Sequence, residues 1–162
     1  MLLRAAAGVT PHGAAVYELP ISDVPMYNAD IEARGDPAAI ASLKLAITSA
    51  DALLIATPEY NHGIPGVLKN VVDWISRPPF ASVLTNKPIA LIGASTGSGA
   101  TLRARAQLRE VLSVPNADLL EATVGVAGAY SVFEDGGRLV DATIERELRE
   151  LMARLVARVH ER

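Results

Sequence analysis

Two short stretches of the chain are apolar at nearly every position. The stretches 51–57 and 87–94 each end in turn-forming residues, and strands that are buried on both faces have this uninterrupted pattern. The stretches 119–126 and 14–19 have similar length, the second with a weaker pattern, and we expect them to lie in the same layer. The sequence therefore predicts four strands of one sheet.

Segments between these stretches have apolar residues at helical spacing. The spacing predicts helices over 37–50, 66–76 and 102–112, and Asp36 is expected to cap the first of them ahead of Pro37. A C-terminal amphipathic helix is predicted by the stripe Leu148, Leu151, Met152, Leu155, Val156 and Val159. Alternation of strands and helices indicates an α/β fold with a parallel sheet covered by helices on both faces.

Length and charge narrow the classes of function. The 162 residues fit a single domain, 1–162. The 15 Lys and Arg and the 18 Asp and Glu give a net charge of −3 without a basic block, which argues against a nucleic-acid partner. No apolar run approaches the roughly 18 residues that span a bilayer, and there is no cysteine. We expect a cytoplasmic protein without nucleic-acid or membrane partners.

The loop after the first stretch is rich in planar and conformationally restricted residues. It reads Thr57-Pro-Glu-Tyr-Asn-His-Gly-Ile-Pro-Gly66 and leads from a strand into a helix. Ligands of open parallel sheets bind at the carboxyl ends of the strands, and the free N–H groups of such a loop suit the edge of an electron-rich ring. A tight turn without a ligand explains the glycines and prolines equally well.

The whole string from Pro58 to Arg77 closely resembles the signature of the NADPH-dependent FMN reductase family, whose fold is flavodoxin-like. The resemblance implies a three-layer sandwich that holds FMN at the strand ends. It implies that the ring is lined by Pro58, Glu59, Tyr60 and Asn61, with His62 and Gly63 beside it. The family most often has Ser at the position of Gly63, so a hydroxyl contact is missing.

A second loop, Gly93-Ala-Ser-Thr-Gly-Ser-Gly99, leads from a predicted strand into a helix. Small residues at a helix N-terminus suit an anion or a ring edge. In the resembling family this loop flanks the flavin opposite the first loop, which assigns cofactor binding to Ser95, Thr96, Gly97 and Gly99. A capping turn without a ligand is the alternative for Thr96 and Ser98.

The same loop also matches the G-x-S-x-G nucleophile elbow at Gly93–Gly97. A serine hydrolase would need an acid and then a histidine downstream of Ser95, and the downstream histidine is His160, close to the end of an amphipathic segment. A hydrolase is therefore a minority interpretation.

Other charged and aromatic residues suggest no further chemistry. His12, His62 and His160 lack the spacing of metal ligands, so we expect no metal site. Arg103, Arg105 and Arg109 are expected on a solvated helix face, or at a contact between subunits, since the family typically forms dimers or tetramers. Trp74 is expected to pack in the core.

The start of the chain departs from the family pattern. Family members open with a buried strand and a phosphate-binding loop, whereas residues 2–8 resemble the helix that follows them. That strand is central in the family's order, and each unpaired buried backbone group costs about 1–3 kcal/mol. The alternatives are a longer native chain, a rearranged or borrowed strand, and a degenerate domain that has lost FMN.

The resemblance predicts an NAD(P)H-dependent oxidoreductase with FMN and NADPH as cofactors. Electrons would pass through FMN to a quinone, azo, flavin or metal-oxyanion acceptor by a ping-pong mechanism. The cofactor supplies the redox chemistry, so no catalytic acid, base or nucleophile is assigned. A flavodoxin-like subunit that binds a partner protein without FMN is the alternative, and a homodimer or homotetramer is expected.

Overall fold

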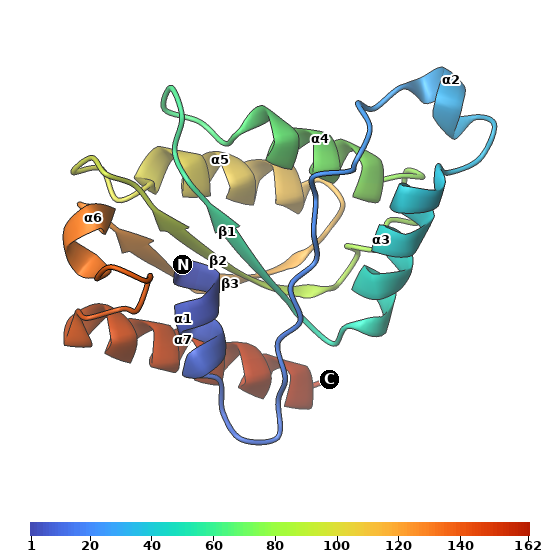
Figure 1. Ribbon diagram of the computed structural model, residues 1–162. Coiled ribbons are helices and arrows are strands. Elements are labelled where there is room, and N and C mark those ends of the chain that lie inside the picture. Colours follow the sequence, from blue (N-terminus) through green and yellow to red (C-terminus); the bar gives the residue numbers. More distant parts are fainter.

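A computed structural model describes residues 1–162 and shows three parallel strands with helices on both faces (Figure 1). The strands β1 (Leu53–Thr57), β2 (Pro88–Ala94) and β3 (Asp118–Val126) lie in the order β1-β2-β3. Ile89 and Leu91 of β2 pack on one side of the sheet, and Ala90 and Ile92 pack on the other. Burial of both faces explains why β2 is apolar throughout.

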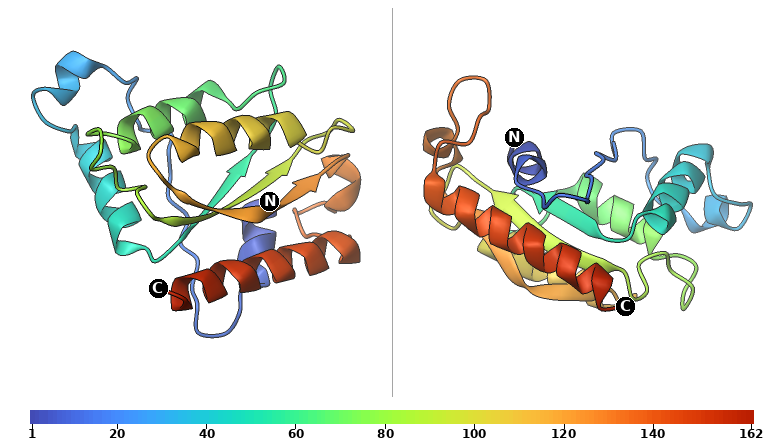
Figure 2. Two further views of the ribbon diagram at one scale, coloured as in Figure 1. Left: turned by 180° about the vertical axis from the view of Figure 1, so that it is seen from behind. Right: turned by 90° about the horizontal axis from the view of Figure 1, so that it is seen from below.

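The helices form two layers, as the sequence predicted. On one face lie α3 (Ala38–Ser49), α4 (Gly66–Ile75) and α5 (Leu102–Ser113), and on the other lie α1 (Leu2–Gly8) and α7 (Ala142–His160) (Figure 2). Two single-turn helices, α2 (Ala29–Glu32) and α6 (Ala129–Val132), lie outside these layers. The flavodoxin-like α/β sandwich is thereby confirmed, and no helix combines the length and apolarity needed to cross a membrane.

The predicted strand at 14–19 is wrong. These residues have no regular secondary structure, and β1 has β2 as its only neighbour in the sheet. In the flavodoxin-like order a further strand separates the segment 14–19 from β1, so this segment has no strand beside it with which to pair. Residues 53–56 of β1 are consequently only half-buried, although their apolar sequence suits full burial.

Two predictions about charged residues are also wrong. Asp36 does not cap α3, because Pro37 occupies the N-cap position and the Asp36 carboxylate instead pairs with Lys44 Nζ at 2.8 Å. Arg105 and Arg109 are not simply solvated. The Arg105 guanidinium donates to Ala100 O and Thr123 Oγ1, and Arg109 donates to Leu120 O, since both side chains reach across the edge of the sheet at β3.

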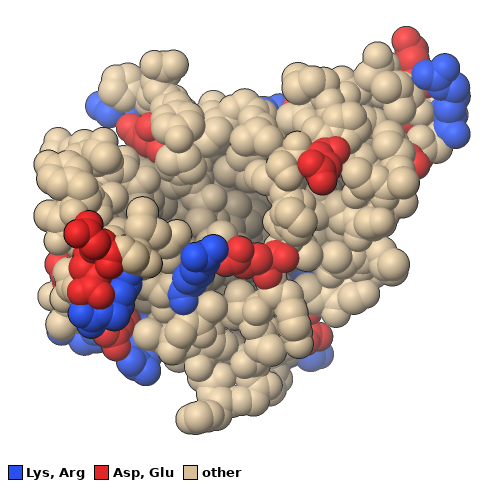
Figure 3. Space-filling model, viewed as in Figure 1, with Lys and Arg blue, Asp and Glu red and all other residues tan.

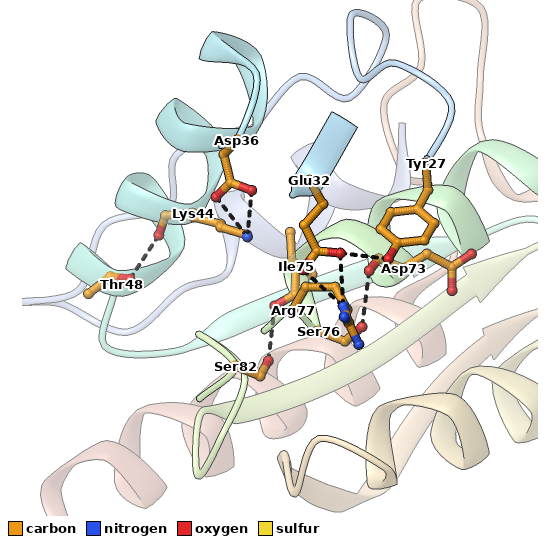
Figure 4. A network of polar contacts seen from close by, with 10 residues as sticks. All are labelled: Tyr27, Glu32, Asp36, Lys44, Thr48, Asp73, Ile75, Ser76, Arg77 and Ser82. Carbon is orange, nitrogen blue, oxygen red and sulfur yellow. Dashed lines mark hydrogen bonds and ion pairs between the residues drawn. The ribbon is translucent and has the colours of Figure 1, made fainter. Parts of the chain in front are cut away.

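The segment 25–32 is anchored over α4 and its C-terminal end. Glu32 accepts hydrogen bonds from Tyr27 Oη at 2.6 Å and from Arg77 Nε at 3.0 Å (Figure 4). The Tyr27 hydroxyl and the Arg77 guanidinium together hold the pKa of the Glu32 carboxyl below its usual value. The indole of Trp74 adds a hydrogen bond to Pro25 O at 2.8 Å.

Candidate functional site

The carboxyl ends of the three parallel strands bring their following loops together at one edge of the sheet. The loop after β2 is fastened to β3, because Ser95 N donates to Val126 O at 3.0 Å. Gly128 N donates to Gly97 O at 3.3 Å, which adds the segment after β3 to the same edge. The loops 58–65 and 95–101 therefore flank one region, as the sequence predicted.

The first loop ends in a tight turn. Tyr60 and Gly63 exchange two backbone hydrogen bonds of 3.0 Å, and the residues between them have positive φ angles, 50° at Asn61 and 64° at His62. Two successive left-handed residues define a type I′ turn, which Asn adopts more readily than most residues. Tyr60, Asn61 and His62 are exposed. The side chains of Tyr60 and Asn61 are free to meet a ligand, whereas His62 Nδ1 already contacts Arg103 NH1.

Glu59 connects the first loop to α5, the helix that follows the second loop. Its Oε2 accepts hydrogen bonds from the backbone N–H of Arg103 at 3.1 Å and of Ala104 at 3.2 Å, in the first turn of α5. These bonds, that of Ala104 above all, hold the pKa of the Glu59 carboxyl below its usual value. The carboxylate is thus turned toward α5, and the contact of Glu59 with a cofactor stays a prediction.

Gly63 is held by a side chain that the sequence analysis did not single out. Gln107 Oε1 accepts a hydrogen bond from Ile64 N at 2.8 Å. A Cβ atom on Gly63 would lie 2.8 Å from that same oxygen. The amide of Gln107 therefore occupies the space that a serine side chain at position 63 would need, which gives the departure from the family pattern a physical reason.

The second loop presents unused hydrogen-bond donors. Thr96, Gly97, Ser98 and Gly99 are exposed, and their backbone N–H groups have no acceptor within the protein. Beneath them the side chain of Thr101 is fully buried, with φ of 58° at the start of α5. The buried Thr101 fixes the end of the loop, while the four free N–H groups are available to a ligand with acceptor atoms.

Gly93 allows this close packing of loop and sheet. A Cβ atom there would lie 2.1 Å from Thr101 Oγ1 and 2.7 Å from Thr57 O. We expect Gly93→Ala to lower the free energy of unfolding by about 1–3 kcal/mol, because backbone and a buried side chain must move. Gly97→Ala is the matched control, since its Cβ would meet nothing within 4 Å. Urea denaturation measures both, and equal stability of the two variants would contradict the packing argument.

The arrangement fits a flat ring with nitrogen and oxygen atoms along its edge. A type I′ turn lies on one side and four free N–H donors lie on the other, and Glu59 and Gln107 fix the first loop to α5. Acceptor atoms on a ring edge would satisfy donors that the protein leaves open. The residues present therefore fit the isoalloxazine ring of FMN.

Nothing in the site supports a serine nucleophile. Ser95 Oγ donates to Gly97 O at 3.4 Å and has no histidine partner. His160 lies at the end of α7 and lines an apolar groove beside β1, away from the strand-end loops. His62 lies in the first loop, where its Nδ1 is 3.0 Å from Arg103 NH1. No three His, Asp or Glu side chains are placed to hold a metal ion.

Sequence reasoning missed Gln107, and it placed Arg103 on a solvated helix face or at a subunit contact without a role in the site. The two residues are four positions apart and so lie on one face of α5, which is the face turned to the first loop. Their spacing of four residues, just after the Gly-rich loop, was the one sequence feature that could have indicated a shared helix face. The sequence does not specify which face of α5 the first loop covers.

Comparison with known proteins agrees with this geometry. The sequence model of the NADPH-dependent FMN reductase family matches residues 1–132. The chain belongs to this family. An NAD(P)H-dependent FMN reductase of Pseudomonas aeruginosa is 42% identical over 140 residues, which cover 86% of this chain and 75% of the relative. A 2-hydroxy-1,4-benzoquinone reductase of a Burkholderia species is 34% identical over 162 residues, covering 99% of this chain and 88% of the relative.

Two solved flavoenzyme structures have the same fold. The flavoenzyme NAD(P)H:(acceptor) oxidoreductase FerB of Paracoccus denitrificans superimposes with a TM-score of 0.87 and 28% identity, covering 99% of this chain and 88% of that one. An FMN-dependent NADH-azoreductase of Bacillus anthracis, solved in complex with FMN, has a TM-score of 0.63 at 15% identity and shares the fold; the alignment covers 95% of this chain and 87% of that one. Family membership makes FMN and NAD(P)H the cofactors of this chain and reductase chemistry its activity.

Proposed function

We propose that this protein holds FMN between the loops 58–63 and 95–99 and passes electrons from NAD(P)H to a small acceptor. The observation that carries the proposal is the pair of loops, of which the first is fixed to α5 through Glu59 and the second has unused N–H donors. Relatives named quinone reductase and 2-hydroxy-1,4-benzoquinone reductase support a quinone as the acceptor. Azo compounds, free flavin and metal oxyanions also accept electrons, and we include them as alternative acceptors.

The residues supply position rather than acid or base chemistry. FMN, when bound, supplies hydride acceptance and electron transfer. The N–H groups of Thr96, Gly97 and Gly99 would donate to acceptor atoms at one edge of the ring. The turn at Asn61 and His62 would border the ring on the other side, with the backbone of Pro58 and Glu59 beneath it. Ser95 secures the second loop through its backbone bond to β3.

One exposed binding face would serve both substrates in turn. Tyr60 is 63% exposed at the rim of the site, and residues 61–62 and 96–99 of the two loops are also exposed. NAD(P)H and the acceptor would therefore occupy the same place successively, which predicts ping-pong kinetics. Parallel lines in double-reciprocal plots at several quinone concentrations would support this order, and intersecting lines would contradict it.

The proposal is tested by flavin binding and turnover. We expect the purified protein to quench the fluorescence of added FMN with saturation, to retain the yellow colour after desalting, and to oxidise NADPH when 1,4-benzoquinone is added. Tyr60→Ala should weaken FMN binding about two- to tenfold, as expected for the loss of one aromatic contact. Tyr17→Ala is the control, because Tyr17 is 83% exposed and lies away from the loops.

Each alternative predicts a different result. A folded protein that binds no FMN would favour a flavodoxin-like subunit that acts through a partner protein. Ester hydrolysis that Ser95→Ala abolishes would favour the hydrolase.

We also propose a homodimer or homotetramer in the cytoplasm, where NAD(P)H is available. Exposed apolar side chains close to the site, Tyr60, Val67 and Leu102, support a subunit contact there. Sedimentation velocity measures the oligomeric state, and a monomer at all concentrations would contradict the proposal.

A further inference from the structure

Arg103 is a cation beside the candidate site that forms no hydrogen bond with a carboxylate. Its NH1 is 3.8 Å from Glu59 Oε1, beyond hydrogen-bond distance, and the Glu59 carboxylate is already bonded to backbone N–H groups of α5. The other two arginines of α5 are engaged, since Arg105 donates to Thr123 Oγ1 and Arg109 donates to Leu120 O. Arg103 is therefore the arginine of α5 whose charge remains open to a ligand.

A histidine of the first loop holds the Arg103 side chain in place. Arg103 NH1 lies 3.0 Å from His62 Nδ1, and because a guanidinium only donates hydrogen bonds, Nδ1 is the acceptor. The proton of the neutral imidazole is then on Nε2, which has no partner in the protein. Both side chains are exposed, 62% at Arg103 and 74% at His62. The turn of the first loop and the first turn of α5 thus present unused N–H donors to solvent side by side.

The guanidinium of Arg103 lies next to both loops. Its partner His62 belongs to the turn of the first loop. A Cβ atom on Gly99 would lie 3.9 Å from Glu59 Oε1, and the same oxygen is 3.8 Å from Arg103 NH1. The guanidinium is therefore also close to the end of the second loop, and a ligand held between the loops is within its reach.

Charged side chains are otherwise scarce around the two loops. Glu59 is the only Asp, Glu, Lys or Arg in the loop 58–65, and the loop 95–101 contains none. Figure 3, seen from the same side as Figure 1, shows few charged groups where these loops lie. Arg138, in the segment after β3, pairs with Glu134. An anionic ligand at this edge of the sheet would therefore find its free cation at Arg103.

We propose that Arg103, held by His62, binds a phosphate group of NAD(P)H. This inference rests on the proposed function, in which NAD(P)H and the acceptor use one exposed face in turn. NAD(P)H carries a diphosphate, and NADPH a further phosphate on its ribose, whereas a simple quinone carries none. A guanidinium binds phosphate through two parallel charge-assisted hydrogen bonds. Arg103 thus selects the nucleotide for the first half of the reaction and leaves the binding of the quinone unaffected.

A hydride donor without phosphate tests this assignment. The compound 1-benzyl-1,4-dihydronicotinamide has the reacting ring of NADPH but no phosphate group. We expect Arg103→Ala to lower the ratio of kcat/KM for NADPH to kcat/KM for this donor about fivefold, as for the loss of an exposed charge-assisted contact. Arg103→Lys keeps the charge without the paired donors, so its ratio should lie between those of the two proteins. Added NaCl should lower the ratio of the wild type more than that of Arg103→Ala.

Binding of the unreactive oxidised nucleotide measures the same contact without turnover. Isothermal titration calorimetry with NADP⁺, in the presence of FMN, should give a dissociation constant about fivefold higher for Arg103→Ala than for the wild type. Arg146→Ala is the matched control, because Arg146 is an exposed arginine of α7 without an ion pair and α7 lies on the other face of the sheet from α5. Equal losses for NAD⁺ and NADP⁺ would assign the diphosphate to Arg103, and a loss for NADP⁺ alone would assign the ribose phosphate.

Two results would overturn the assignment of Arg103. A nucleotide affinity and a kcat/KM ratio equal to those of Arg146→Ala would show that Arg103 contacts no phosphate of NAD(P)H. Weaker binding of FMN by Arg103→Ala, with binding of riboflavin unchanged, would place the phosphate of FMN there instead. Failure of the proposed function is a separate outcome, since the wild type would then bind no FMN and would not oxidise the phosphate-free donor. The NADP⁺ titration tests Arg103 in either case.

Discussion

Replacing Trp74 by alanine is expected to lower the free energy of unfolding by about 3–5 kcal/mol, the cost of removing a large buried aromatic side chain. Trp74 is 0% exposed. Its ring meets that of Tyr27 edge-on, with 5.0 Å between centroids, and its Nε1–H donates to Pro25 O at 2.8 Å. The substitution leaves a cavity in the core and also removes two of the contacts that hold the segment 25–32 on α4.

The loss is measured by urea denaturation followed by circular dichroism. Trp74→Phe should cost less than Trp74→Ala, since it keeps most of the aromatic packing and removes the hydrogen bond to Pro25. Phe80→Ala is the control, because Phe80 is fully exposed in the loop after α4 and should change stability by less than about 0.5 kcal/mol. A Trp74→Ala protein as stable as the Phe80→Ala protein would contradict the proposed anchoring.

The sequence predicted those parts of the fold in which local pattern and tertiary packing agree. β2 is apolar throughout because helices cover both of its faces, and α4 and α7 have apolar stripes that match their buried sides. The segment 14–19 has a weaker strand pattern, and its conformation depends on a neighbour that it lacks. The local hydrophobic pattern indicates whether a residue is suited to burial. It does not indicate whether a neighbouring strand is present, because that depends on the whole sheet.

The candidate site, like the fold, could be predicted from the sequence only in part. The two loops could be located from the sequence because each comes directly after an apolar strand, and parallel strands bring their carboxyl ends together. The contacts that fix the loops could not be predicted. Gln107 reaches Ile64 and Glu59 reaches the first turn of α5 across more than forty positions of sequence. Such contacts depend on the angle at which α5 packs, which no local spacing specifies.

Replacing Glu59 by alanine is expected to weaken FMN binding by about ten- to a hundredfold, the size of effect that a small misplacement of binding groups produces. The Glu59 carboxylate joins the loop 58–63 to the N–H groups of Arg103 and Ala104. Such bonds are charge-assisted, and they also benefit from the dipole at the start of α5. Without them the turn at Asn61 and His62 loses its fixed position relative to the second loop.

Acidity should have the same effect as the substitution. The bonded N–H groups lower the pKa of the Glu59 carboxyl, so the folded protein favours the charged form. The stabilisation is then complete above the ordinary pKa of a glutamate, near about 4.3, and is lost as the pH falls through the lowered value. FMN affinity of the wild type should decline in that acidic range. The Glu59→Gln variant keeps one acceptor oxygen but does not titrate. Its FMN affinity should be weaker than that of the wild type, and position 59 should add no pH dependence in the acidic range.

Fluorescence titration of FMN at several pH values measures both effects, and Glu110→Ala supplies the matched control. Glu110 is an exposed glutamate of α5 whose carboxylate takes part in no hydrogen bond or ion pair, so its removal should leave FMN affinity unchanged. Binding by Glu59→Ala equal to that of the control would show that the loops hold their positions without the carboxylate. Urea denaturation of Glu59→Ala tests the hydrogen bonds between the loop and α5 separately from FMN binding. If Glu59→Ala is destabilised while the wild type binds no FMN, the result would support these hydrogen bonds and contradict the flavin site.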